Sequence, residues 1–112
     1  MEPKGKYIPE EKLQEILEKH KKWLEGEEDG ECADLSYANL RSCDLHNANL
    51  ERANLSYAEL DSADLTNANL KGVNLKGANL KIANLAYSNL SNAILDDANL
   101  EGTNFYCIYK GE

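Results

Sequence analysis

The chain has 112 residues, which is enough for one domain, and it carries a formal net charge of −8. Because acids outnumber Lys and Arg in both residues 1–30 and residues 31–112, we expect neither direct binding to nucleic acid nor attachment to a membrane. Leu and Ala dominate the apolar residues while Phe, Met and Trp occur once each, which indicates one packing environment repeated many times.

Residues 1–8 are expected to be a flexible N-terminus, and residues 9–30 to form a helix followed by an acidic turn. Pro9 favours the first turn of a helix, and Gly26 favours its end. Between them six residues recur at helical spacing and make one apolar stripe, with His20 and Trp23 at its rim. We expect this helix to cap the segment that begins at residue 31; pairing with a second copy or filling a partner's groove are the alternatives. The stripe residues are Leu13, Ile16, Leu17, His20, Trp23 and Leu24.

From residue 31 to residue 105 the sequence repeats every five residues. A large apolar residue stands at each fifth position, a small residue stands two places before it, and Asn or Asp usually stands directly before it. These fifteen large residues are the predicted core: Leu35, Leu40, Leu45, Leu50, Leu55, Leu60, Leu65, Leu70, Leu75, Leu80, Leu85, Leu90, Leu95, Leu100 and Phe105.

A period of five matches neither an α-helix nor a simple strand. Three residues of each quintet read as a short extended side whose first and third side chains point inward, and the two polar residues after them read as a corner. A chain that turns the same way at every corner coils into a β-solenoid whose coils hydrogen-bond to one another. The recurrence of Ser36-Tyr37 as Ser56-Tyr57 favours four sides per coil.

Tandem motifs such as Ala33-Asp34-Leu35, Ala48-Asn49-Leu50 and Ala78-Asn79-Leu80 resemble the pentapeptide-repeat family. The resemblance covers residues 31–105 and implies an all-β solenoid. In detail it implies a right-handed quadrilateral β-helix. Fifteen quintets at four per coil give just under four coils, and the N-terminal amphipathic α-helix is the expected cap. Similar members of that family dimerise through the C-terminal end of the solenoid.

Two groups of aromatic and apolar residues are candidate interfaces. Tyr37 and Tyr57 are expected to stack on one outer face, where the stack either serves the scaffold alone or makes an adaptable contact area for an unidentified protein partner. Ile82 and Tyr87 are weaker candidates on other faces. In the C-terminal tail, residues 106–112, the aromatic segment is expected either to fold back over the last coil or to form a homodimer contact. The candidates at that end are Phe105, Tyr106, Ile108 and Tyr109.

A rod filled with Leu and Ala leaves no pocket for catalysis, so we expect no enzyme, no cofactor and no metal site. His46 reads as an isolated outward residue, Asp44 and Asp64 as an exposed carboxylate pair, and Cys43 as inert core. Three cysteines without a CxxC pair predict a reducing cytoplasm, and the first residues lack the apolar stretch of a secretory signal.

The sequence therefore predicts a non-enzymatic scaffold that acts as a protein-protein interaction module with an unidentified partner. The resemblance also offers an alternative, a DNA mimic that binds or protects DNA gyrase. Residues 31–112 hold 11 acids and 6 bases, a net charge of −5, whereas DNA as long as the expected rod carries about eleven charges. The alternative would therefore require a dimer.

Overall fold

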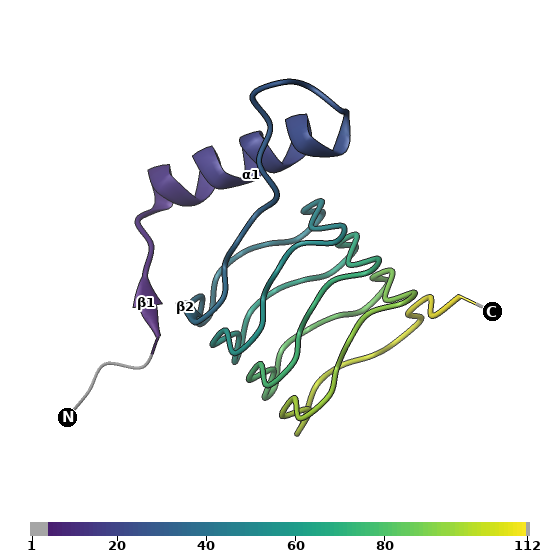
Figure 1. The fold of residues 1–112 in the computed structure, drawn as a ribbon. Coiled ribbons are helices and arrows are strands. Elements are labelled where there is room, and N and C mark those ends of the chain that lie inside the picture. Colours follow the sequence, from purple (N-terminus) through teal and green to yellow (C-terminus); the bar gives the residue numbers. More distant parts are fainter. Residues whose placement is uncertain (1–4, 112) are drawn as a thin grey trace.

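The computed structural model describes residues 5–111. Its regular elements are β1 (Lys6–Tyr7), α1 (Glu10–Leu24) and β2 (Ala38–Asn39). From residue 34 to residue 109 the chain forms a ladder of isolated parallel bridges rather than long strands. Figure 1 shows these residues as a stack of coils, with α1 lying across one end of the stack and β1 running beside β2.

Every bridge in the stack joins residues that are twenty apart, so one coil takes four quintets. Asp34 bridges Asn54, which also bridges Asn74 in the next coil. The Leu35 N–H donates to the Asn54 carbonyl at 2.8 Å, and the Asn54 N–H donates to the Ala33 carbonyl at 3.0 Å. Each coil thus satisfies the backbone of its neighbours, which is the hydrogen-bond pattern of a parallel sheet.

The corner between two sides is a tight turn whose third residue has a positive φ. At the first corner the Ala38 N–H donates to the Leu35 carbonyl at 3.1 Å, and Tyr37 has a φ of 62°. The residue before each leucine also steadies the corner, since Asn54 Oδ1 accepts a hydrogen bond from the Ser56 N–H at 3.0 Å. This contact explains why Asn and Asp recur at that position.

The inward side chains form a continuous column of Leu and Ala. Twelve of the fifteen predicted core residues, Leu35 through Leu90, are buried. Leu95 and Phe105 pack partly against this core, whereas 36% of the Leu100 surface is exposed. Leu95, Leu100 and Phe105 are less buried than the other twelve because no described residue covers the last coil.

Helix α1 packs across the first coil through its apolar stripe. Leu13 and His20 are buried, Ile16 and Leu17 pack partly against the core, and Trp23 and Leu24 are half-buried. The helix ends after Leu24, and the Gly26 N–H then donates to the Trp23 carbonyl at 3.1 Å. No helix among residues 5–111 is long and apolar enough to cross a bilayer.

The structure differs from the expected flexible N-terminus at Lys6–Tyr7. Strand β1 pairs in parallel with β2, with Lys6 opposite Ala38 and Tyr7 opposite Asn39. The first coil offers unpaired backbone groups at its edge, and β1 takes up some of them: the Lys6 N–H donates to the Tyr37 carbonyl at 2.7 Å. Residues 1–4 lie outside the described residues.

The C-terminal tail, residues 106–112, is expected either to fold back over the last coil or to contact a second copy, and the first alternative is wrong for residues 106–109. These residues continue the ladder by one more quintet: Tyr109 bridges Asn89, and its carbonyl accepts the Leu90 N–H at 2.6 Å. The backbone around Asn89 therefore gains hydrogen-bond partners in the next coil. If residues 106–109 folded over the core, those backbone groups would be unpaired. Residue 112 lies outside the described part.

Candidate functional site

Corner residues stack in columns along the rod, and one column carries two tyrosines. The rings of Tyr37 and Tyr57 lie 5.1 Å apart between centroids, with an interplanar angle of 13°. They are 59% and 40% exposed. The next residue in the column is Gly77, where an added Cβ would collide with the Tyr57 ring. Gly77 thus makes the room that lets this ring lie flat along the column.

The positive φ values of Tyr37 and Tyr57, 62° and 60°, do not distinguish them, because other corners of the solenoid, such as those at Arg52 and Ile82, have the same conformation. What distinguishes this column is that two large aromatic rings stack on each other and remain substantially exposed. Stacking returns about 0.5–1.5 kcal/mol for the pair beyond the apolar area that the rings bury. An exposed aromatic stack of this kind is a candidate contact surface.

A second column carries charges of alternating sign, as the twenty-residue spacing predicts. Arg41 Nε donates to both Asp61 carboxylate oxygens at 3.0 and 3.1 Å, and Lys81 lies 3.9 Å from Glu101. Arg41 also reaches diagonally to Glu59, eighteen residues ahead, at 3.1 Å. These are surface pairs, although the carboxylates of Glu59 and Asp61 are half-buried, so they contribute little to stability.

On the next side of the rod Asp44 and Asp64 are bridge partners, as sequence reasoning expected, and His46, which it read as isolated, lies beside them. One ligand atom from each lies within 4.8 Å of the others. Asp44 Oδ1 accepts hydrogen bonds from the His46 backbone N–H at 3.2 Å and from the ring Nδ1. These contacts hold the pKa of Asp44 below its usual value and raise the pKa of His46. The signal that sequence reasoning missed is local and diagonal: Asp44, two residues before His46, contacts its ring, and Asp64, eighteen residues ahead, lies within 4.8 Å, whereas the stacked partner of His46 is Thr66.

His20 was expected at the rim of the helical stripe, and this is wrong, because the side chain is fully buried between α1 and the first coil. Its Nδ1 accepts the Ala33 N–H at 2.9 Å, so the proton is on Nε2, which donates to the Glu51 carbonyl at 2.9 Å. Burial lowers the pKa of His20. The neutral His20 ring thus joins α1 to the first coil through two hydrogen bonds to backbone groups. The Trp23 ring stacks on it, with 5.6 Å between the ring centroids.

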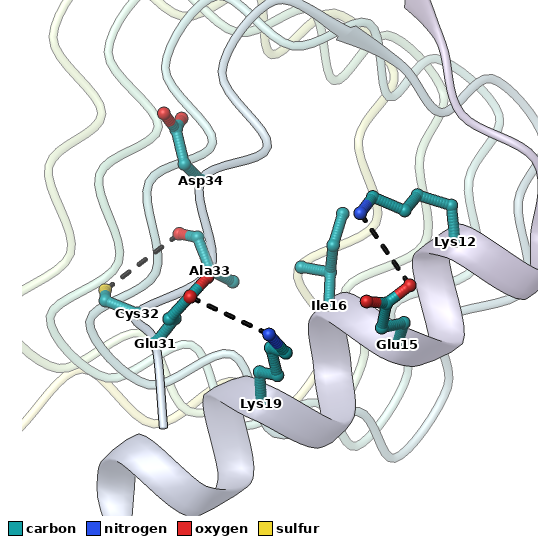
Figure 2. A pocket seen from close by; sticks show the side chains of 8 residues that line it. All are labelled: Lys12, Glu15, Ile16, Lys19, Glu31, Cys32, Ala33 and Asp34. Carbon is teal, nitrogen blue, oxygen red and sulfur yellow. Dashed lines mark hydrogen bonds and ion pairs between the residues drawn. The ribbon is translucent and has the colours of Figure 1, made fainter. Parts of the chain in front are cut away.

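Two hollows lie between α1 and the first coil, and neither has the features of a catalytic site. The first, of about 160 Å³, is lined by ion-paired residues: Lys12 with Glu15, and Lys19 with Glu31 (Figure 2). Cys32 also lines it, but burial raises the pKa of this thiol and so disfavours the reactive thiolate. The second, of about 370 Å³, is lined by Gln14, Leu17, Glu18, Lys21, Glu25, Ala48 and Asn49, which include no nucleophile–base pair.

The end of the solenoid formed by residues 94–109 is a second candidate contact surface. Ile94, Leu100 and Tyr109 are exposed there, while Phe105 and Ile108 are half-buried against the core. Among the described residues, the N–H groups of Leu95, Leu100 and Phe105 have no backbone partner. The structure separates Tyr106 from this end, because its ring packs edge-on against Tyr87 at 5.5 Å on the side of the rod.

Comparison with known proteins gives the same repeat. A family model described as Pentapeptide repeats matches eight copies over residues 33–72 and 74–106. No curated protein matches the chain at significant similarity.

Two solved structures are similar to the chain. HetL, a pentapeptide repeat protein involved in heterocyst differentiation regulation from the cyanobacterium Nostoc, is 39% identical with a TM-score of 0.66, over 68% of this chain and 35% of HetL. A pentapeptide repeat protein from the Arabidopsis thaliana thylakoid lumen is 25% identical with a TM-score of 0.68, over 70% of this chain and 55% of that protein. The match thus spans from about a third to about half of these structures. The repeat region is a right-handed β-helical solenoid.

Proposed function

Since the chain belongs to the pentapeptide-repeat family, we propose that it is a non-enzymatic scaffold that binds another protein through the outer face of its solenoid. The observation that carries this proposal is the Tyr37–Tyr57 stack, in which two large aromatic rings lie nearly parallel and remain exposed on the outer face. Aromatic side chains on a rigid scaffold contribute contact area at low entropic cost. Within residues 5–111 the interior is filled mostly by Leu and Ala.

A binding experiment on the intact chain tests this face. The chain is immobilised and exposed to a lysate of its native host, beside a Tyr37→Asn/Tyr57→Asn variant. Asn favours the positive φ of both corners, so the variant retains the fold while it loses both rings. We expect a bound protein that the variant fails to retain. Tyr87→Asn is the matched control, because Tyr87 is another exposed tyrosine at a positive-φ corner. Equal recovery by all three proteins would contradict the proposal.

We further propose that residues 94–109 form a homodimer contact with a second copy. The end of the solenoid combines exposed apolar side chains, including Leu100 and Ile94, with unpaired backbone donors. A second copy related by a two-fold axis offers the same groups in reverse, so one contact covers both ends. Light scattering tests this: we expect twice the 12.5 kDa mass of one chain, and a monomer for Ile108→Lys. A mass that Ile108→Lys leaves unchanged excludes the contact.

Helix α1 is proposed to cap the opposite end of the rod. It covers the first coil through Leu13 and His20, and β1 pairs with the edge of that coil beside it. Bridged positions recur every five residues from Asp34 to Tyr109, which is sixteen positions, or four coils at four per coil. We therefore propose four coils, one quintet more than the fifteen core residues imply.

The cytoplasm remains the proposed compartment. All three cysteines are free, and Cys32 and Cys107 are exposed, which suits a reducing environment. Binding to DNA gyrase is the less favoured function, because Arg41 and Lys81 interrupt the acidic column that a DNA mimic would need.

A further inference from the structure

Two carboxylates on the outer face of the solenoid oppose each other across the ladder. Asp44 and Asp64 are bridge partners, and like charges at directly opposite positions destabilise a sheet. The next residues in this column are the neutral Asn84 and Asn104, so the excess negative charge is confined to the first two coils.

On the neighbouring side of the rod the equivalent charges are neutralised by an arginine. Arg41 directly follows a core leucine and contacts Glu59, eighteen residues ahead, and Asp61, twenty residues ahead. His46 occupies the corresponding place, because it also follows a core leucine and lies eighteen residues before an acid, Asp64. An imidazole is a weaker cation than a guanidinium, and in its neutral form it offers a lone pair that a guanidinium lacks.

Each carboxylate is held in place through one oxygen. Asp44 Oδ1 accepts from the His46 N–H at 3.2 Å and from the ring Nδ1, so Nε2 is the nitrogen with a lone pair in the neutral ring. Asp64 Oδ1 accepts from the Thr66 N–H at 3.0 Å and the Thr66 hydroxyl at 2.7 Å. Among residues 5–111, the Oδ2 atoms of both have no hydrogen-bond partner. Two fixed carboxylates, each with a free oxygen, form a site that needs little reorganisation to accept a cation.

From this arrangement we infer that Asp44, His46 and Asp64 bind a first-row divalent transition metal ion. One ligand atom of each already lies within 4.8 Å of the others. One imidazole nitrogen and two carboxylate oxygens suit Zn²⁺, Ni²⁺ or Mn²⁺, whereas Ca²⁺ takes six to eight oxygen ligands, more than the site offers. Asp44 and His46 are exposed, so the ion keeps open positions for water or for a side chain of a bound protein.

Zn²⁺ titration by calorimetry at neutral pH tests the site. Because thiols are also ligands for Zn²⁺, the full chain is used with the exposed Cys32 and Cys107 both changed to Ser. We expect one ion per chain with a dissociation constant of about 10 µM or tighter. His46→Asn and Asp64→Asn should each weaken binding by about tenfold or more, since even outer-shell substitutions cost 10–100-fold. Circular dichroism checks that each variant keeps the fold.

Asp34→Asn is the matched control. Asp34 holds the Ser36 N–H and hydroxyl as Asp64 holds those of Thr66, but its bridge partner is the neutral Asn54. This variant should bind Zn²⁺ as tightly as its parent. Three results would overturn the inference: no binding up to about 1 mM Zn²⁺, equal affinity after His46→Asn, or an equal loss with Asp34→Asn, which would indicate a general charge effect.

Discussion

Replacing His20 by Phe is predicted to loosen α1 from the first coil. The substitution keeps a ring of similar size against Trp23, but the Ala33 N–H and the Glu51 carbonyl lose their partner. An unpaired buried polar group costs about 1–3 kcal/mol, so the two together cost about 2–6 kcal/mol. A domain of this size is stable by only about 5–15 kcal/mol, so the loss is large.

The buried His20 ring also makes the stability of the protein depend on pH. Burial lowers the pKa of His20 in the folded chain, with the Glu51 and Arg52 charges acting in opposite directions, while the unfolded chain takes up a proton near the ordinary value of about 6.5. Below that pH the unfolded state binds more protons, so stability falls as pH falls, by at most about 1.4 kcal/mol per unit until the lowered pKa is reached. Above about pH 6.5 the neutral His20 ring makes its full contribution to stability.

Urea unfolding followed by Trp23 fluorescence measures both effects, because Trp23 is the only tryptophan and stacks on His20. We expect wild type to lose up to about 1.4 kcal/mol when the pH is lowered from about 6.5 to 5.5, a loss that His20→Phe lacks. His46 has a raised pKa and the opposite sign, but it is present in both proteins and cancels. The reasoning is refuted if both proteins lose stability in parallel, or if His20→Phe is as stable as wild type.

The packing and charge of the coils lead to three further predictions. Gly77→Ala places a Cβ against the Tyr57 ring at a φ of 67°. Urea unfolding should therefore show that the free energy of unfolding falls by about 1–2 kcal/mol or more, and by less in a Tyr57→Ser background. Equal losses in the two backgrounds would contradict this prediction. Leu60→Ala should lower the free energy of unfolding by about 2–5 kcal/mol, and Leu100→Ala by less, because Leu100 is partly exposed. The reverse order would show that the last coil is covered. Purified DNA gyrase should supercoil DNA at the same rate with excess chain, since the repeat region lacks the charge density of DNA, and a dose-dependent change would favour the mimic.

The sequence predicts the regular part of the molecule because one physical rule repeats. A leucine at every fifth position buries its side chain only if the chain turns at every corner, which fixes the inward column from Leu35 onward. The recurrence of Ser36-Tyr37 twenty residues later indicates four sides, and the ring stack of Tyr37 on Tyr57 results from that register.

The features that sequence reasoning missed depend on contacts the repeat does not encode. Strand β1 has no alternating pattern, because its pairing uses only backbone groups left free by β2. His20 fits an apolar stripe at its rim as well as at its centre, and only the two backbone partners place it inside. Tyr109 continues the ladder although its quintet lacks a core leucine, because bridging requires no particular side chain.

A solenoid of this kind separates folding from surface chemistry. Its stability comes from inward leucines and from a backbone ladder that accepts Tyr, Ser, Arg, Ile and Asp alike at the positive-φ corners. Outer columns are therefore free to vary, and function is expected where a column keeps something the scaffold does not need. Two places meet that condition: the exposed Tyr37–Tyr57 ring stack, and the Asp44–Asp64 pair, whose repulsion a single Asn would remove. Because both lie in the first two coils, on different sides of the rod, a bound protein and a bound ion need not compete.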